Sequence, residues 1–333
     1  MATALERDFD DLARASVAGD VARAAPHLEA ILGVTFPLPE RVPSVVPTRA
    51  PMLVYDVPRH IDVLALRGGA RRIAKFEDLP ASRANALVRI LAAEGLKLVR
   101  TGPYSKRVDV SVATPMKTGA LYSVIASRGA EAYELAEVEA DRSAAGTRRA
   151  GELLGYPPCC ISHFVAVQAS PVAARQGINE AAIRSFVTAA PMPWELNPLS
   201  LLAPNAFTPC SAACPHALAF ARRVLGAVAQ LEPENIGLVR ATLMRPVLFF
   251  RHSAFFVLDT DSTNPPLAVR RAFLNGVAGE LDTLAAWVHH VVGGGLDESM
   301  LSMDVNHLLI RGRTRDATLK IIDADVPRLL RFS

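Results

Sequence analysis

All four cysteines of this 333-residue chain lie between positions 159 and 214. They are Cys159, Cys160, Cys210 and Cys214. Cysteines scattered at random would rarely gather in so short a stretch, so we interpret the adjacent pair and the C-x-x-x-C pair as parts of one site. The competing interpretation is that they are small buried hydrophobic residues, as free cysteines often are.

Prolines stand beside both pairs and predict that each pair lies at the start of a helix. Pro157 and Pro158 precede the first pair, and Pro215 follows the second. Since proline is favoured in the first turn of a helix, we expect helices over residues 161–168 and 215–231. The unpaired N–H groups and the positive dipole end of a helix start favour a thiolate over a thiol.

Four thiolates in one site predict a bound metal. Structural zinc commonly uses pairs such as C-x-x-x-C, but an adjacent pair is awkward around one tetrahedral ion. In an iron–sulfur cluster, neighbouring thiolates can bind different irons. We therefore favour a [4Fe-4S] cluster held by the four cysteines, with zinc as the alternative. His163 and His216 lie near the two pairs and are possible substitutes for a cysteine ligand, which would leave one thiolate or one iron open for chemistry.

The function that follows is a metal-binding, iron–sulfur protein that transfers electrons or performs cluster-based chemistry, and the sequence leaves open whether it is an enzyme. One alternative is a zinc-stapled module that binds RNA or another protein. Another is a thiol redox protein in which Cys210 and Cys214 cycle between thiol and disulfide. A redox partner or a small-molecule substrate would suit the favoured function.

Residues 151–160 read GELLGYPPCC, and residues 209–214 read PCSAAC. These segments resemble an uncharacterised bacterial and archaeal family that shares L-G-Y-P-x-C-C and P-C-x-x-x-C. The resemblance covers about residues 145–225 and implies that the four cysteines form one site, without supplying a reaction. The cysteine pattern alone is also similar to that of the terminal iron–sulfur subunit of respiratory complex I and of hydrogenase small subunits.

Apolar patterning predicts an α/β or α+β fold with mixed sheet units on either side of a central helical module that carries the cysteines. We expect an N-terminal α/β unit with a Pro-rich connector (1–120), the helical module (121–232) and a C-terminal α+β unit (233–333). The expected helices are 1–33, 81–94, 121–149, 181–188 and 267–292. The expected strands are 61–66, 96–99, 108–112, 246–251, 254–259, 307–311 and 318–322.

Composition limits the classes of protein. Half of the residues are hydrophobic and 21% are charged, which excludes a disordered chain. No apolar run is long enough to span a membrane, and the acidic N-terminus lacks the pattern of a secretory signal, so we expect a cytoplasmic protein without membrane contact. The formal charge of +3 is too small to favour a nucleic-acid partner, although arginines leave that option open.

Overall fold

The computed structural model of the chain describes residues 60–104, 121–141, 143–171, 173, 181–183, 185, 191–199, 202–233, 236–251, 254–260, 265–276, 288–290, 292–303, 307–320 and 328–333. The helix expected over 1–33, the Pro-rich connector and the strand expected over 108–112 lie outside these residues, as does half of the helix expected over 181–188.

A three-stranded antiparallel sheet forms the N-terminal end of this part. Its elements are α4 (His60–Arg67), β1 (Ile73–Pro80), α5 (Ala81–Ala93), β2 (Lys97–Tyr104) and β3 (Leu121–Ser127). The strand order is β1-β3-β2. Helix α5 covers the sheet because its Leu87 and Leu91 share a buried cluster with Phe76 and Val124 of the strands.

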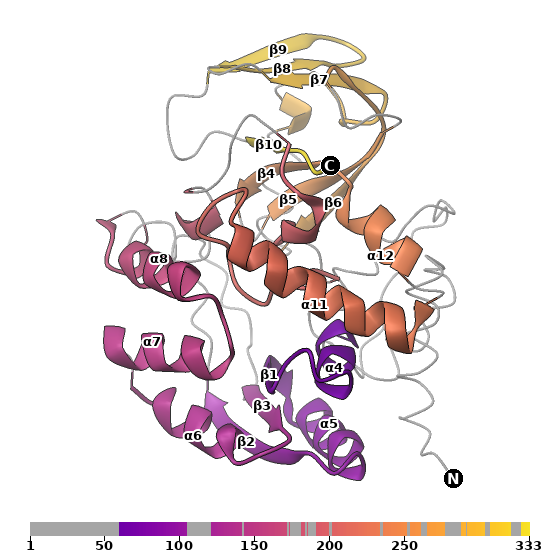
Figure 1. The fold of residues 1–333 in the computed structure, drawn as a ribbon. Helices are drawn as coiled ribbons and strands as arrows, with labels where there is room; N and C mark the ends of the chain where they lie inside the picture. Colours follow the sequence, from indigo (N-terminus) through magenta and orange to yellow (C-terminus); the bar gives the residue numbers. More distant parts are fainter. Residues whose placement is uncertain are drawn as a thin grey trace.

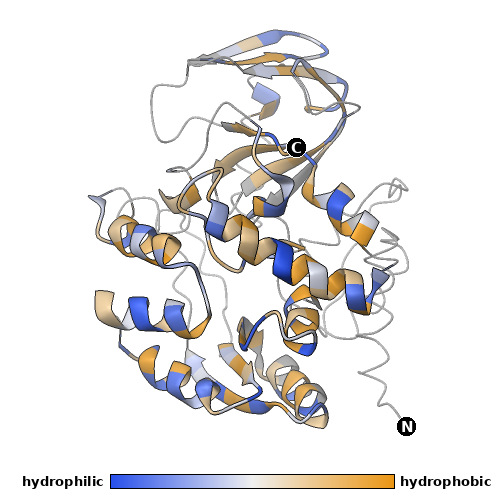
Figure 2. Cartoon of the chain, viewed as in Figure 1, coloured by the Kyte–Doolittle hydropathy of each residue, from blue (hydrophilic) through white to orange (hydrophobic). Residues whose placement is uncertain are grey.

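The middle of the chain is helical and carries the cysteines. Its elements are α6 (Glu131–Val138), α7 (Ala144–Leu153), α8 (Pro158–Gln168), the 3-10 turn η1 (Trp194–Leu196), α11 (Pro215–Leu231) and α12 (Ile236–Leu243). Helix α11 lies between the two sheets (Figure 1) and buries Phe220 and Val224 against Ile61 and Leu64 of α4. The helices α5 and α6 show hydrophobic and hydrophilic residues on different sides (Figure 2), as expected for helices with one buried face.

A seven-stranded antiparallel sheet forms the C-terminal part. Its strands are β4 (Val247–Arg251), β5 (Ala254–Thr260), β6 (Leu267–Gly276), β7 (Ser299–Met303), β8 (His307–Arg311), β9 (Asp316–Lys320) and β10 (Arg328–Leu330). The order is β10-β4-β5-β6-β7-β8-β9. Leu248 on β4 shares a core with Leu308 on β8, so the sheet curves over itself. Its neighbour Phe249 faces the other way and packs with Met192, close to the cysteine module.

The predicted fold class is confirmed, with sheets on either side of the helical module (Figure 1). All the strand pairings within the two sheets are antiparallel, which is the α+β arrangement. The boundary expected at 120/121 falls within the first sheet, because β3 begins at Leu121 and lies between β1 and β2. No helix among the described residues is both long and apolar enough to cross a membrane.

Several elements match their predicted positions, and three do not. Helices α5, α8 and α11, the β4–β5 hairpin and the pairing of β8 with β9 are confirmed. The strand expected over 61–66 is wrong, because this apolar run forms α4 and packs on α11. The helices expected over 121–149 and 267–292 are wrong at their starts, which form β3 and β6. Packing on α11 decides the first segment and pairing with neighbouring strands decides the other two, and local apolar patterns do not reveal such contacts.

Candidate metal centre

The four cysteine sulfur atoms converge on one point, and all lie within 4.8 Å of one another. The Sγ of Cys159 lies 3.9 Å from that of Cys160 and 3.7 Å from that of Cys214, and the last two are 3.8 Å apart. Cys160 and Cys214 are buried, whereas Cys159 and Cys210 are partly exposed. Even the adjacent pair directs both thiols inward, so the two pairs form one group of four potential ligands.

Two glycines allow α8 to start close beside α7. At Gly151 on α7, a Cβ would lie 2.8 Å from the Ile161 side chain, so the absence of a side chain allows α7 and α8 to approach closely. Gly155 ends α7 with a φ of +72°, a left-handed conformation that favours glycine. Pro157 and Pro158 then start α8, which puts the adjacent cysteines in its first turn.

Tyr156 fixes the second cysteine segment against the first. Its phenol donates a hydrogen bond to the Ala206 carbonyl at 3.2 Å. The centres of the Tyr156 and Phe207 rings lie 4.6 Å apart, and the Phe207 ring contacts the Phe220 ring of α11 edge-on. Because Phe207 also packs against the cysteine cluster, this aromatic group supports the loop that carries Cys210.

The start of α11 supplies the fourth corner of the site. Cys214 is the N-cap residue of α11, and its sulfur accepts a hydrogen bond from the Ala217 N–H at 3.4 Å. Pro215 occupies the first helical position, as the sequence predicts. The starts of α8 and α11 therefore both face the sulfur atoms, and their dipoles favour negative charge there.

The thiols differ in how readily they ionise. Burial raises the pKa of Cys160, and burial together with contacts to Cys214 and Cys159 raises the pKa of Cys210 to about 11. Burial also opposes ionisation of Cys214, but hydrogen bonds from the Ala217 N–H and from the other thiols outweigh it and lower its pKa. Cys214 is thus the thiol best prepared to be a thiolate.

Residues 124–244 match the model of a family described as a protein of unknown function (DUF483). The match spans α6 to α12 and includes all four cysteines. It supports the resemblance to an uncharacterised family that the sequence suggested, over a longer stretch. No curated protein and no solved structure matches the chain.

The two candidate histidines lie outside the sulfur group. The Nε2 atom of His163 lies 2.8 Å from the Ser185 hydroxyl and not among the cysteine sulfur atoms. Burial lowers the pKa of His163, which favours a neutral ring. His216 is exposed in the first turn of α11. Neither belongs to the group of residues that could share one ion within the described part of the chain.

Residues far from the cysteines in sequence hold the cysteine segments in place, through contacts that the sequence did not predict. Leu196 in η1 is fully buried against Cys160 and Cys214. Arg71 and Asp62 form a buried ion pair at 2.5 Å, and the Arg71 guanidinium lies 5.9 Å from the centre of the Tyr156 ring. Leu196 and the cysteines lie far apart in sequence, so no local pattern reveals their contact. The only sequence signal is weak: Leu196 is an apolar residue in a Pro-rich loop.

Proposed function

We propose that the chain is a zinc-binding protein in which one zinc ion, held by Cys159, Cys160, Cys210 and Cys214, joins the starts of α8 and α11. The observation that carries this proposal is the spacing of the sulfur atoms. Zinc–sulfur bonds of about 2.3 Å in a tetrahedron separate the sulfur atoms by about 3.8 Å. Three of the four sulfur atoms are 3.7 to 3.9 Å apart.

The same spacing argues against the [4Fe-4S] cluster that the sequence favoured. In such a cluster each thiolate binds a different iron, so the cysteine sulfurs lie about 6 Å apart. All four sulfur atoms lie within 4.8 Å of one another. The adjacent pair also fits around one ion, because the sulfur atoms of Cys159 and Cys160 lie 3.9 Å apart.

Zinc suits a site whose corners are four thiols, two of them buried. Four protein ligands close the coordination sphere, which is typical of structural rather than catalytic zinc. The doubly negative tetrathiolate centre would be stabilised by the two helix starts that face it. The metal would therefore fix the module, and cysteines that are not joined in disulfides agree with the reducing cytoplasm that we propose as the compartment.

Metal analysis of protein purified without added metal tests the proposal. We expect about one zinc per chain, lost in Cys214→Ser, and retained in His163→Ala and His216→Ala as matched controls. Replacement of zinc by Co²⁺ should give the intense visible absorption of tetrahedral cobalt bound to thiolates. A brown protein with equal iron and acid-labile sulfide would overturn the zinc proposal, and a protein that binds neither metal would overturn the metal site itself.

A further inference from the structure

A pocket of about 530 Å³ lies next to the aromatic group of the metal module. Its walls come from the turn between α4 and β1, from α6, from the C-terminal end of α7, and from α11. None of the four cysteines lines it. Tyr156 follows the lining residue Gly155 and packs on Phe220, which also lines the pocket, so the pocket and the metal centre share a wall.

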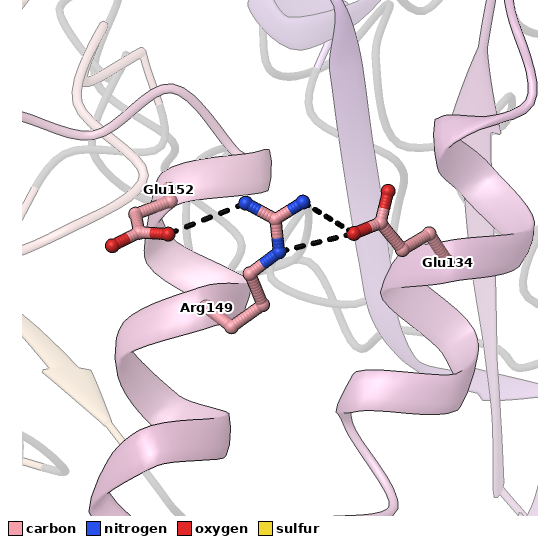
Figure 3. A network of polar contacts seen from close by, with 3 residues as sticks. All are labelled: Glu134, Arg149 and Glu152. Carbon is pink, nitrogen blue, oxygen red and sulfur yellow. Dashed lines mark hydrogen bonds and ion pairs between the residues drawn. The ribbon is translucent and has the colours of Figure 1, made fainter.

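One side of the pocket is acidic. Glu131 and Glu134 on α6 and Glu152 on α7 line it. Arg149 on α7 lies between Glu134 and Glu152 and pairs with both (Figure 3), so this single cation is shared by two carboxylates. This side therefore holds three carboxylates against one guanidinium and carries excess negative charge.

The part of the wall that comes from the α4–β1 turn and α11 is basic. It contains Arg71 and Arg72 from the α4–β1 turn and Arg223 from α11. Arg71 is neutralised by Asp62, with which it forms a buried ion pair. Arg72 is exposed and makes no ion pair within the part of the chain that the structure describes, and Arg223 stacks over Phe220 at 5.4 Å. Two guanidinium groups thus remain available to an anion.

Backbone and apolar groups complete the pocket. Gly69 and Gly155 both line it, and a Cβ at either position would meet no atom within 4 Å. A ligand can therefore approach the main chain closely at both glycines. Leu153, Leu154 and Phe220 add apolar surface. Charged side chains nevertheless make up more than half of the lining residues, so charge decides which ligands the pocket selects.

We propose that this pocket binds a short peptide as a zwitterion, with its ammonium group towards Glu131 and its carboxylate towards Arg72 and Arg223. Because the acidic and basic side chains lie on different elements of the pocket wall, they favour a ligand with a positive group at one end and a negative group at the other. A free amino acid would fill only a small part of the volume, whereas a peptide of about two or three residues suits it. This inference does not depend on the identity of the metal.

Calorimetric titration of the metal-loaded full chain with trialanine and trileucine at low salt tests the proposal. We expect saturable binding of at least one of them, and weaker binding by about tenfold when its amino group is acetylated or its carboxylate is amidated. Free alanine and free leucine should bind more weakly than the peptides. Tighter binding of a free amino acid than of its peptide would contradict the assigned ligand class.

Two variants assign the two ends of the peptide. Arg72→Gln should weaken binding of the free peptide but leave binding of its C-terminal amide unchanged. Glu131→Gln should weaken binding of the free peptide but leave binding of its N-acetylated form unchanged. Arg89→Gln on α5 and Glu137→Gln on α6 are matched controls, because neither residue lines the pocket. The proposal is overturned if neither peptide binds, if the fully blocked peptide binds as tightly, or if inorganic phosphate competes fully and Glu131→Gln has no effect.

Discussion

Cys160 and Cys210 determine how the proposed site responds to pH. Zinc binds thiolates, so each thiol that is protonated in the metal-free site must release its proton first. Because the pKa of Cys160 is raised and that of Cys210 is about 11, both hold protons throughout the neutral range. Protons therefore compete with zinc at these two positions.

We predict that zinc affinity falls as the pH is lowered from 9 to 6, by about tenfold per pH unit for each of these two thiols. A raised pKa also means that the affinity continues to rise above pH 9, the ordinary value for a thiol, towards about 11. Competition with a chromophoric chelator across this range measures the slope. An affinity that does not change with pH would contradict the assignment of these thiols as ligands.

At the scale of elements, the close approach of α7 and α8 positions the adjacent cysteines. Gly151→Ala should destabilise the protein by about 1 to 3 kcal/mol, because the new Cβ would overlap Ile161. The free energy of unfolding in urea measures this effect. Combining it with Ile161→Ala should cost less than the sum of the two single changes, since the overlap is then relieved.

Gly226→Ala on α11 is the matched control for this change. A Cβ at Gly226 meets no atom within 4 Å, and alanine favours a helix more than glycine does, so this variant should be neutral or more stable by up to about 1 kcal/mol. If Gly151→Ala behaved like Gly226→Ala, the close contact between α7 and α8 would not be what positions the cysteines.

The features of the site that were predictable from the sequence are those encoded locally. Pro158 and Pro215 mark helix starts beside the cysteines, and both helices begin there. The sulfur spacing was not predictable, because it depends on how two segments about fifty residues apart pack through Tyr156 and Phe207. That is why the sequence favoured a cluster and the distances favour a single ion.

The same distinction explains the fold predictions. Helix α11 has a long amphipathic pattern that its own residues specify, so its bounds were predicted. The run 61–66 is short and apolar throughout most of its length, and only its packing on α11 makes it helical. The segment 267–276 became a strand because β5 and β7 lie on either side of it.

At the scale of the whole molecule, the last described residues join the C-terminal sheet to the helical module that carries the cysteines. Met192 and Phe332 form a parallel bridge, in which the Met192 N–H donates to Arg331 and the Ser333 N–H donates to Met192. Phe332 is fully buried with Met192 and Phe249. The loop that contains Leu196, which packs on the cysteines, is thereby anchored to the sheet.

Phe332→Ala should therefore lower the free energy of unfolding by about 3 to 5 kcal/mol, because it leaves a cavity between sheet and module. Leu309→Ala, at an exposed position of β8, is the control and should change stability by no more than about 0.5 kcal/mol. Urea unfolding followed by circular dichroism compares the two. Equal effects of the two substitutions would contradict the role given to Phe332.

X-ray absorption spectroscopy of the purified, metal-loaded protein measures the distances around the metal and so distinguishes a single zinc ion from a cluster. We predict one zinc ion surrounded by four sulfur atoms at about 2.3 Å, with no neighbouring metal. An iron edge with both sulfide and a short metal–metal distance, or zinc with fewer than four sulfur neighbours, would contradict the assignment of Cys159, Cys160, Cys210 and Cys214 to a single tetrahedral ion.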